Sequence, residues 1–323
     1  MGKIFAFISM FFVTASAFFQ PEVEVIPEKK DDGVTMLFVG DTMLGRQVGS
    51  HIKQGIDPFL YVRETMMNYD LVVANLEGPI SEPMLCQKKA YSFRFATTTA
   101  KMLSDNNIGL VNLANNHSFD CYTKGLINTR QNLTKANVEY FGGGELADSY
   151  IIKEIKGKKI AFVGIDLSIG EIPIKSFYPL ISRLDKENDS VVVSIHWGNE
   201  YELNYSNNQK VIGHNLVDKG ADLIIGHHPH VIQPLEIYNN KPIFYSLGNF
   251  VFDQFEEETV KGFAAEIFWD GEVTDLKILP YRIKTSQPSF LEEEEKEKFC
   301  RKFLQNFPSE NKNEEICSVE INP

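Results

Sequence analysis

Side chains that commonly bind metal ions follow most of the short apolar runs of this sequence. They are an aspartate, a glutamate, an asparagine and three histidines: Asp41, Glu77, Asn116, His196, His228 and His230. Each lies shortly after the carboxyl end of a run that is typical of a buried strand. In open α/β sheets, ligands bind in the crevice outside the carboxyl ends of the strands. We therefore expect these six side chains to meet around a shared cation.

The strongest local pattern is His227-His228-Pro229-His230, which follows an apolar run at residues 221–225. Three imidazoles in four positions are hard to explain by packing, because each brings two ring nitrogens that need partners. A metal ion satisfies that need. The cluster contains no cysteine, which disfavours a structural zinc site or an iron–sulfur centre. Imidazole and carboxylate instead suit one or two divalent ions of Mn, Zn or Fe.

Each motif also has a simpler interpretation. Asp41 could end a strand in an ordinary turn, and Glu77 could be a loop carboxylate in solvent. Residues 115–117 could cap the helix predicted after them, and His196 could be a core histidine with satisfied ring nitrogens. The metal site is favoured because six candidate ligands on five separate strand ends support it together.

An alternation of apolar runs and helical patterns must position these residues, which predicts an α/β fold. Seven runs are predicted to be buried strands, namely residues 35–40, 71–75, 109–114, 159–165, 191–195, 221–225 and 243–245. Four segments carry apolar residues at helical spacing, namely residues 58–68, 98–106, 124–136 and 208–219.

Two pairs of runs flank short turns and predict hairpins, namely 151–155 with 159–163, and 263–268 with 273–279. Hairpins favour a mixed sheet, or two sheets face to face, over one doubly wound parallel sheet. The final stretch, residues 290–307, predicts an amphipathic helix whose acidic run at 292–295 is a solvated face.

The charge of the chain limits its partners. The formal net charge is −12 and the pI is about 5.1. This leaves no broad basic surface for a phosphate backbone, so a nucleic-acid partner is not expected. An anionic substrate would have to be drawn by a local cation.

The first residues predict export. Lys3 precedes an apolar stretch, and Ala15-Ser16-Ala17 matches the small-residue pattern that signal peptidases cut. An uncleaved anchor or a buried helix are the alternatives for this stretch. The expected division is a signal peptide or anchor at 1–17, a linker at 18–33, one domain at 34–285, and a terminal helix and tail at 286–323.

Four cysteines, Cys86, Cys121, Cys300 and Cys317, allow three disulfide pairings in an oxidising compartment. Proximity in the sequence suggests Cys86–Cys121 and Cys300–Cys317. Four free structural thiols remain an equally open alternative.

Six motifs occur in the order found in a known family. They are Gly40-Asp41-Thr42-Met43-Leu44-Gly45-Arg46, Asn75-Leu76-Glu77, Leu113-Ala114-Asn115-Asn116-His117-Ser118-Phe119-Asp120, His196-Trp197-Gly198, Gly226-His227-His228-Pro229-His230-Val231-Ile232-Gln233 and Tyr245-Ser246-Leu247-Gly248-Asn249-Phe250. Over residues 35–253 the chain resembles the CapA/PgsA capsule-synthesis family, which is associated with bacterial poly-γ-glutamate. This resemblance implies a branch of the calcineurin-like metallophosphoesterases. Their fold is a four-layer α/β/β/α sandwich of two mixed sheets flanked by helices.

The resemblance also implies roles for individual residues. Asp41 and His230 would bind one metal, Glu77 would bridge, and a second metal would be bound by Asn116, His196 and His228. His117 would be the acid facing the leaving group, with Asp120 orienting it, and Arg46 would be an anion clamp. Two cations can clamp both the attacking and the leaving side of an in-line displacement.

The first motif departs from the wider superfamily. There it is Asp-x-His, whereas here Thr42 and Met43 follow Asp41, so one imidazole of the first metal is missing. Glu77 also replaces the usual aspartate. The departure leaves open a weaker first metal, a single-metal site or a changed reaction.

The leading hypothesis is a CapA-like extracytoplasmic protein that makes or processes a polyanionic envelope polymer at a metal-dependent hydrolase-type site. It would work with a membrane-bound polymer synthesis or export complex. One alternative is a phosphoesterase acting on a small exported phosphate ester. Another is a non-catalytic polymer-binding or assembly subunit.

Overall fold

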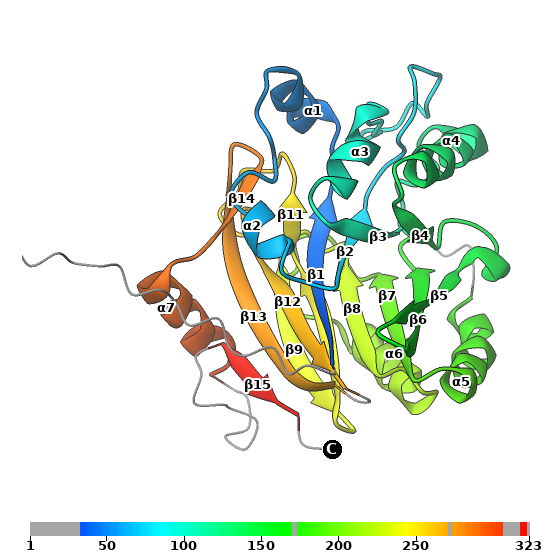
Figure 1. Cartoon of the computed structure of the whole chain (residues 1–323), viewed down its shortest axis with the longest axis vertical. Helices are drawn as coiled ribbons and strands as arrows, with labels where there is room; N and C mark the ends of the chain where they lie inside the picture. The colour runs from blue at the N-terminus through cyan, green and yellow to red at the C-terminus, as the bar shows by residue number, and fades with distance from the viewer. Residues whose placement is uncertain (1–32, 170–172, 271–272, 306–316, 322–323) are drawn as a thin grey trace, which may run out of the picture. The chain divides into compact units, whose positions relative to one another are not determined.

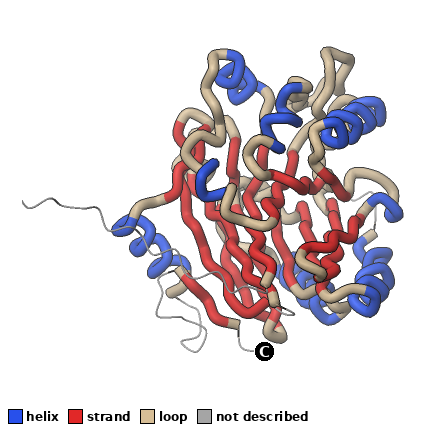
Figure 2. The backbone as a smooth tube through the Cα atoms, in the orientation of Figure 1, coloured by secondary structure: helices blue, strands red, loops and turns tan. Residues whose placement is uncertain are grey.

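Two β-sheets pack face to face, with helices on their outer faces (Figure 1). The computed structural model describes residues 33–169, 173–270, 273–305 and 317–321. Figure 2 shows the strands gathered centrally, with helices outside them. The predicted architecture of two mixed sheets flanked by helices is confirmed. The expected signal peptide or anchor at 1–17 and almost all of the expected linker lie outside the described residues.

The first sheet has nine strands within the described residues, and β1 is central. The order is β14-β13-β12-β1-β2-β3-β4, with β11 also paired to β1 and β15 to β13. Their bounds are β1 Val34–Thr42, β2 Leu71–Leu76, β3 Ile108–Asn112, β4 Glu139–Phe141, β11 Asn249–Val251, β12 Lys261–Trp269, β13 Val273–Lys284, β14 Gln287–Phe290 and β15 Ser318–Glu320. Strands β1 to β4 are parallel, so their carboxyl ends share one edge.

The second sheet has six strands within the described residues, in the order β5-β6-β7-β8-β10-β9. Their bounds are β5 Tyr150–Ile155, β6 Lys158–Asp166, β7 Ser190–His196, β8 Leu223–His227, β9 Ile232–Tyr238 and β10 Lys241–Leu247. The four inner strands are parallel, and β5 and β9 pair antiparallel at the two edges. Both predicted hairpins, β5–β6 here and β12–β13 in the first sheet, are therefore present.

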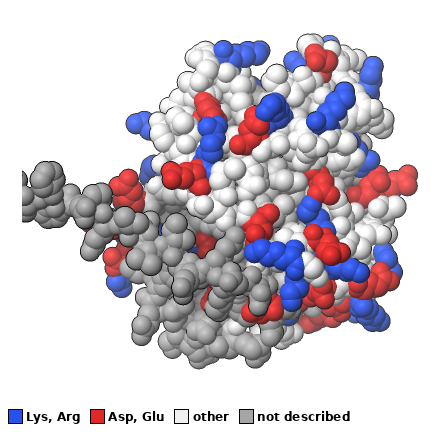
Figure 3. All heavy atoms as spheres, in the orientation of Figure 1, with Lys and Arg blue, Asp and Glu red and all other residues white. Residues whose placement is uncertain are grey.

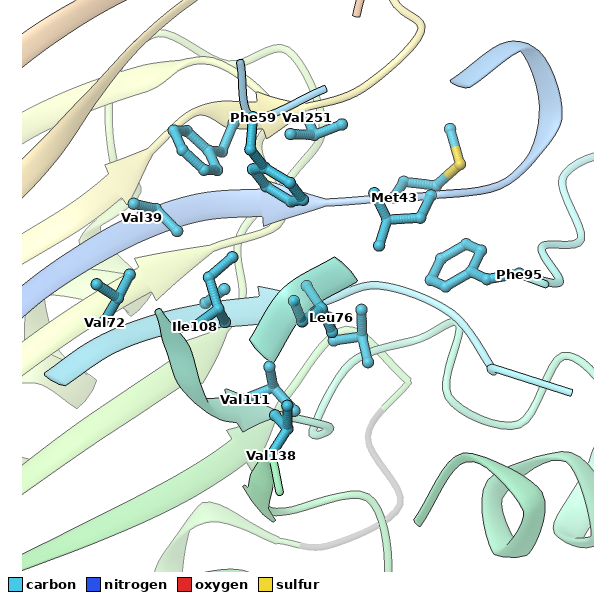
Figure 4. Close-up of a cluster of buried hydrophobic side chains, with 14 of the residues drawn as sticks. Val39, Met43, Phe59, Val72, Leu76, Phe95, Ile108, Val111, Val138 and Val251 are labelled. Atoms are coloured by element: carbon cyan, nitrogen blue, oxygen red, sulfur yellow. The ribbon is translucent and has the colours of Figure 1, made fainter. Parts of the chain in front are cut away.

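Three apolar clusters separate the four layers. The α-helices are α1 Arg46–Lys53, α2 Arg63–Met66, α3 Thr98–Ser104, α4 Tyr122–Lys135, α5 Phe177–Glu187, α6 Asn207–Asp218 and α7 Glu293–Phe303; two 3₁₀ turns are η1 Leu146–Asp148 and η2 Ile174–Ser176. One cluster joins the first sheet to α1 through α4, and Figure 4 shows part of it. A second fills the space between the sheets, and a third joins the second sheet to α5 and α6.

Two predicted helices have different bounds in the structure. Only Arg63–Met66 is α-helical within the predicted segment 58–68. Its first half forms turns instead, because the Asp57 carboxylate accepts a hydrogen bond from the Phe59 N–H at 2.9 Å and competes with a helical hydrogen-bond pattern. The terminal helix begins at Glu293, since Phe290 already belongs to β14.

The described residues after 285, namely 286–305 and 317–321, join the same core as the rest. Strands β14 and β15 extend the first sheet, and Cys300 and Leu304 of the α7 region pack into the cluster between the sheets. Among the described residues, no helix has the length and apolar character needed to cross a bilayer.

Candidate metal centre

Asp41 lies where β1 passes very close to the segment after β10. A Cβ atom at Gly40 would lie 2.0 Å from the Gly248 carbonyl oxygen, so only glycine fits there. This approach lets the Asp41 N–H donate to that same carbonyl at 3.1 Å. The glycine of the Gly-Asp motif therefore fixes the carboxyl end of β1, and Asp41 is completely buried there.

Three buried side chains gather beside this strand end. Asp41, Glu77 and His230 each offer a ligand atom, and these atoms all lie within 4.8 Å of one another. His230 Nδ1 lies 3.2 Å from Asp41 Oδ2, and its Nε2 lies 3.7 Å from Glu77 Oε1. Two carboxylates and one imidazole are a donor set that a divalent transition ion can use. The group could bind such an ion.

Glu77 is the most informative member of this group. Its side chain is completely buried, yet neither carboxylate oxygen has a hydrogen-bond partner among the described residues. Burial raises the pKa of Glu77 well above its usual value. A buried carboxylate without partners is costly, and a bound cation would satisfy both oxygens. The residues present therefore fit a metal ion.

Asn116, His196 and His228 form a second group next to the first. His196 Nε2 lies 3.1 Å from Asn116 Oδ1 and 3.0 Å from His228 Nδ1. Burial lowers the pKa of His196 well below its usual value and that of His228 to about 4. Both imidazoles are therefore neutral at pH 7, which is the form that binds metals.

Asn75 and His227 connect the two groups. The Asn75 amide donates to Asp41 Oδ1 at 2.8 Å and lies 3.4 Å from His196 Nδ1. His227 Nδ1 lies 3.2 Å from the same Asp41 oxygen. All six predicted ligands are thus brought to one edge of the sheets, with Asp41 between them.

His230 is held by two acceptors on its Nδ1 side. Besides Asp41, Asn249 Oδ1 lies 3.0 Å from His230 Nδ1. Burial lowers the pKa of His230, but the charge of Glu77 and hydrogen bonding to Asp41 outweigh it and raise the pKa to about 9. Without a metal His230 is therefore protonated on both ring nitrogens at pH 7, and an ion bound by Nε2, which faces Glu77, would have to displace the Nε2 proton.

Our sequence prediction did not include Asn75, His227 or Asn249 among the six ligands. Each lies at or next to a strand end, and that position was the available signal. Asn75 and His227 lie in motifs that already supply a ligand, whereas Asn249 lies in the separate motif at residues 245–250. Groups that hydrogen-bond to metal ligands orient those ligands, so a polar residue close to a ligand in the sequence is a candidate for this role.

The turn after β8 directs its histidines through an unusual backbone. His228 and His230 have φ values of 97° and 59°, and both flank Pro229. Left-handed conformations at non-glycine residues cost about 1–3 kcal/mol each and cluster at functional sites. The Tyr201 N–H donates to the Pro229 carbonyl at 2.8 Å and helps to hold this turn. With this backbone conformation, the His230 imidazole lies in the first ligand group and the His228 imidazole in the second.

His117 and Asp120 form a buried pair at the edge of the site. His117 Nδ1 lies 2.8 Å from Asp120 Oδ2, while Nε2 lies 3.8 Å from Glu77 Oε1. Burial lowers the pKa of His117 despite the hydrogen bond to Asp120. Asp120 therefore fixes the proton on Nδ1 and leaves Nε2 facing the candidate metal ligands.

Arg46 lies farther out and already has a partner. Its Nη2 atom is 3.0 Å from Asp253 Oδ1, and the guanidinium lies 5.5 Å from the ring centroids of Tyr91 and Phe93. The Phe93 ring in turn stacks on His117 at 4.0 Å. An anion bound by Arg46 would have to share it with Asp253, so the clamp role stays a prediction.

Comparison with known proteins identifies the family. The family described as bacterial capsule synthesis protein PGA_cap matches residues 35–254, which is more than half of the chain. The chain belongs to the PGA_cap family. The CapA/PgsA resemblance seen in the motifs is thus confirmed.

Two PGA_cap relatives are similar over most of their length. The PGA biosynthesis protein CapA of Bacillus subtilis is 35% identical over 78% of this chain and 72% of its own. The capsule biosynthesis protein CapA of Bacillus anthracis is 32% identical over 82% and 71%. A hypothetical protein from Thermus thermophilus, at 16% identity and TM-score 0.54, shares the fold across 77% of this chain and all of its own.

The departure in the first motif has a structural counterpart in this PGA_cap chain. Met43, which takes the place of the histidine that the metallophosphoesterase resemblance leads us to expect, is buried among apolar side chains that include Leu76 and Phe95 (Figure 4). It therefore offers no imidazole to the site. The imidazole beside Asp41 on this side is instead that of His227.

Both cysteine pairs suggested by sequence proximity are disulfides. Cys86 is bonded to Cys121, and Cys300 to Cys317. The alternative of four free thiols is therefore wrong. The first bond lies directly beside Asp120, and the second joins α7 to the turn before β15.

Proposed function

We propose that this protein acts outside the cytoplasm in the biosynthesis or processing of capsular poly-γ-glutamate, through a metal-dependent hydrolase-type site. Membership of the PGA_cap family and two relatives named for PGA or capsule biosynthesis support the role in making or processing the polymer. The partner would be a polyanionic polymer, with a membrane-bound synthesis or export complex. The formal net charge is −12, and the face in Figure 3 carries acidic and basic side chains interspersed. Attraction of a polyanion would therefore come from a cation bound at the site.

The observation that carries the hydrolase-type site is the Glu77 carboxylate. It is completely buried without hydrogen-bond partners, and it faces Asp41, His230 and His117. A carboxylate of purely structural use would have acquired hydrogen-bond donors on folding, because a buried carboxylate that accepts no hydrogen bond is strongly destabilising.

In the proposed hydrolysis, the ligand groups, His117 and Asp120 have different roles. Asp41, Glu77 and His230, together with Asn116, His196 and His228, would hold divalent ions, whose positive charge would activate water and offset the negative charge that develops on the scissile group. As water attacks the scissile group and the bond to the leaving group breaks, His117, protonated on both ring nitrogens, would give its Nε2 proton to the departing atom, which is the nitrogen of a γ-glutamyl amide or the oxygen of an ester. The ring would then be neutral, with its proton on Nδ1. Asp120 would accept the Nδ1 hydrogen bond and keep the ring in that orientation.

Two observations support the extracytoplasmic location. The chain holds two disulfides, and such bonds persist in oxidising compartments. The first 17 residues also match an export signal or anchor in composition.

The test combines metal analysis with hydrolysis of an activated aryl phosphate and of a γ-glutamyl polymer. Wild type should contain metal and turn over one of them, and His117→Ala should lose about 100-fold in kcat while keeping its metal. His51→Ala, in a half-buried histidine of α1 whose ring contacts Ser286, is the control and should match wild type. Absence of metal-stimulated turnover on both substrates would instead favour the non-catalytic assembly subunit.

A further inference from the structure

A segment without helix or strand lies against the His117–Asp120 pair. We name residues 86–93 the clamp segment; it belongs to the connection between β2 and α3. The Gln87 N–H donates to the Asp120 carbonyl at 2.7 Å, and the Gln87 side chain donates to the Phe119 carbonyl at 3.0 Å. The Cys86–Cys121 disulfide joins the clamp segment covalently to the residue after Asp120.

The clamp segment also supplies most partners of the Asp120 carboxylate. Asp120 is completely buried; its Oδ2 accepts from the Phe93 N–H at 2.6 Å, and its Oδ1 lies 2.5 Å from Lys89 Nζ. The remaining partner is His117 Nδ1. Since a buried carboxylate needs its partners, loss of Lys89 or the Phe93 N–H would release Asp120 from its present place.

Two more contacts reach the residues that face the site. The Phe93 ring stacks on the His117 imidazole, with centroids 4.0 Å apart and planes 25° apart. Lys89 Nζ also donates to the Asn116 carbonyl at 3.2 Å. The clamp segment therefore contacts the ring plane of His117, its hydrogen-bond acceptor and the backbone next to it.

Apolar burial anchors the clamp segment at one end only, where Phe93 is part of the core. Farther back, Tyr91 is 59% exposed and the flanking Leu85 is 73% exposed. The nearest sheet-like contact is an isolated bridge between Ile80 and Phe95. The Cys86–Cys121 disulfide helps to fix this irregular segment, because it restricts the open conformations that the segment could otherwise adopt.

We propose that the clamp segment, fixed by the Cys86–Cys121 disulfide, positions His117 for catalysis, with Lys89 and Phe93 as positioning residues. The inference rests on the proposed function, in which His117 is the proton donor. It adds that the site works fully only in the oxidised chain. It also separates two kinds of side chain around His117, those that would touch substrate and those that act through Asp120.

The first experiment removes each disulfide in the full-length protein. In C86A/C121A, amide hydrogen exchange followed by mass spectrometry should become at least about tenfold faster in residues 86–93 and 116–121. The kcat for the aryl phosphate should fall about tenfold, with KM changed less than about threefold and metal content unchanged. C300A/C317A is the matched control, and it should leave exchange in both segments and kcat at wild-type values.

The second experiment changes Lys89 alone and does not depend on the disulfide variant folding. Lys89→Gln should speed exchange in residues 116–121 and lower kcat, and Lys89→Arg should restore most of both because it keeps the charge beside Asp120. Lys88→Gln, at an exposed neighbouring lysine, is the control. A purely structural role for Lys89 would change unfolding but not the kcat of the folded enzyme.

The outcomes separate this inference from the proposed function. If C86A/C121A and Lys89→Gln keep wild-type exchange in residues 116–121 and wild-type kcat, the positioning role is wrong. If wild type turns over neither substrate, the proposed function fails, and the exchange measurements still decide whether the clamp segment holds His117. Faster exchange with an unchanged kcat would likewise overturn the positioning role.

Discussion

At the scale of single residues, two completely buried carboxylates of this site differ in their partners. Burial raises the pKa of Asp41, but hydrogen bonding to His227 and His230 outweighs it and holds the pKa well below its usual value. Glu77 has no such hydrogen bonds, and its pKa is raised. Asp41 is therefore charged and held by hydrogen bonds within the protein, whereas Glu77 accepts no hydrogen bond among the described residues.

This difference predicts that two similar substitutions will lower the free energy of unfolding by unequal amounts. With a chelator present, Glu77→Gln should change the free energy of unfolding by less than about 1 kcal/mol, because no hydrogen bond is lost. Asp41→Asn should cost about 2 kcal/mol or more, because it breaks charged hydrogen bonds. Urea unfolding with chelator and with Mn²⁺ measures both, and both variants should lose the stabilisation by Mn²⁺. A wild-type response of Glu77→Gln to the ion would contradict the assignment.

At the scale of elements, glycines allow the close approach of segments at the strand ends. Gly40 of β1 faces the Gly248 carbonyl, and a Cβ at Gly226 of β8 would lie 2.1 Å from the Tyr245 carbonyl oxygen. Both glycines come directly before the residues that build the site. In the Gly-Asp and Gly-His motifs, the glycine therefore allows the close approach of two backbone segments, and the residue after it supplies the polar side chain.

Gly40→Ala should destabilise the protein by about 2 kcal/mol or more, because its Cβ meets backbone that cannot move without breaking β1 from its neighbour. Gly109→Ala in β3 is the control, since its Cβ meets only a Leu71 methyl carbon at 3.3 Å. Thermal unfolding of the two variants checks this. Equal effects would mean that the contact with Gly248 relaxes without cost.

The two sheets are also joined at their opposite end. Asp70 Oδ2 accepts from the backbone N–H and the hydroxyl of Thr35, both at 2.8 Å, and pairs with Lys156 Nζ at 2.7 Å. Thr35 lies in β1, whereas Lys156 lies in the turn between β5 and β6. Burial raises the pKa of Asp70, but these bonds outweigh it and the pKa is lowered.

A lowered pKa in the folded state predicts a definite pH dependence. The stabilisation by Asp70 is present above its unfolded pKa of about 3.9 and is lost as the pH falls through the lower folded value. Asp70→Asn should therefore cost about 1–2 kcal/mol at pH 7, and its difference from wild type should shrink below about pH 4. Urea midpoints at pH 7 and pH 3 measure this. Asp105→Asn, in an exposed pair with Lys101, should show little of either effect.

At the scale of the whole described unit, the last residues complete the first sheet. Strand β15 pairs with β13, and Cys300, Cys317 and Val319 pack into the cluster between the sheets. Its described residues contribute stability rather than ligands, since none of them belongs to the two candidate ligand groups.

C300A/C317A should lower the free energy of unfolding by about 3 kcal/mol, as expected for a bond that closes a loop of this length. Metal content should remain at the wild-type level. Denaturant unfolding and metal analysis of the same sample check both parts. A loss of metal in this variant would show that the terminal segment supports the site.

Much of the fold was predictable because its signals are local. Buried parallel strands are short apolar runs, and runs such as 71–75 and 191–195 needed no knowledge of their neighbours. The helix predicted at 58–68 shrinks to four residues because the Asp57 side chain competes for the backbone of its first half. Strand β11, only three residues long, exists through its pairing with β1, and no local pattern could reveal it.

The sequence by itself determined which residue types stand at the carboxyl ends of the strands, because strand periodicity and the order of motifs are properties of neighbouring residues. Only the tertiary structure decided that Glu77 is buried without partners, that His228 and His230 join different groups, and that residues 86–93 lie on His117. Those facts depend on contacts between segments far apart in the chain, where packing and desolvation of the whole unit set the outcome.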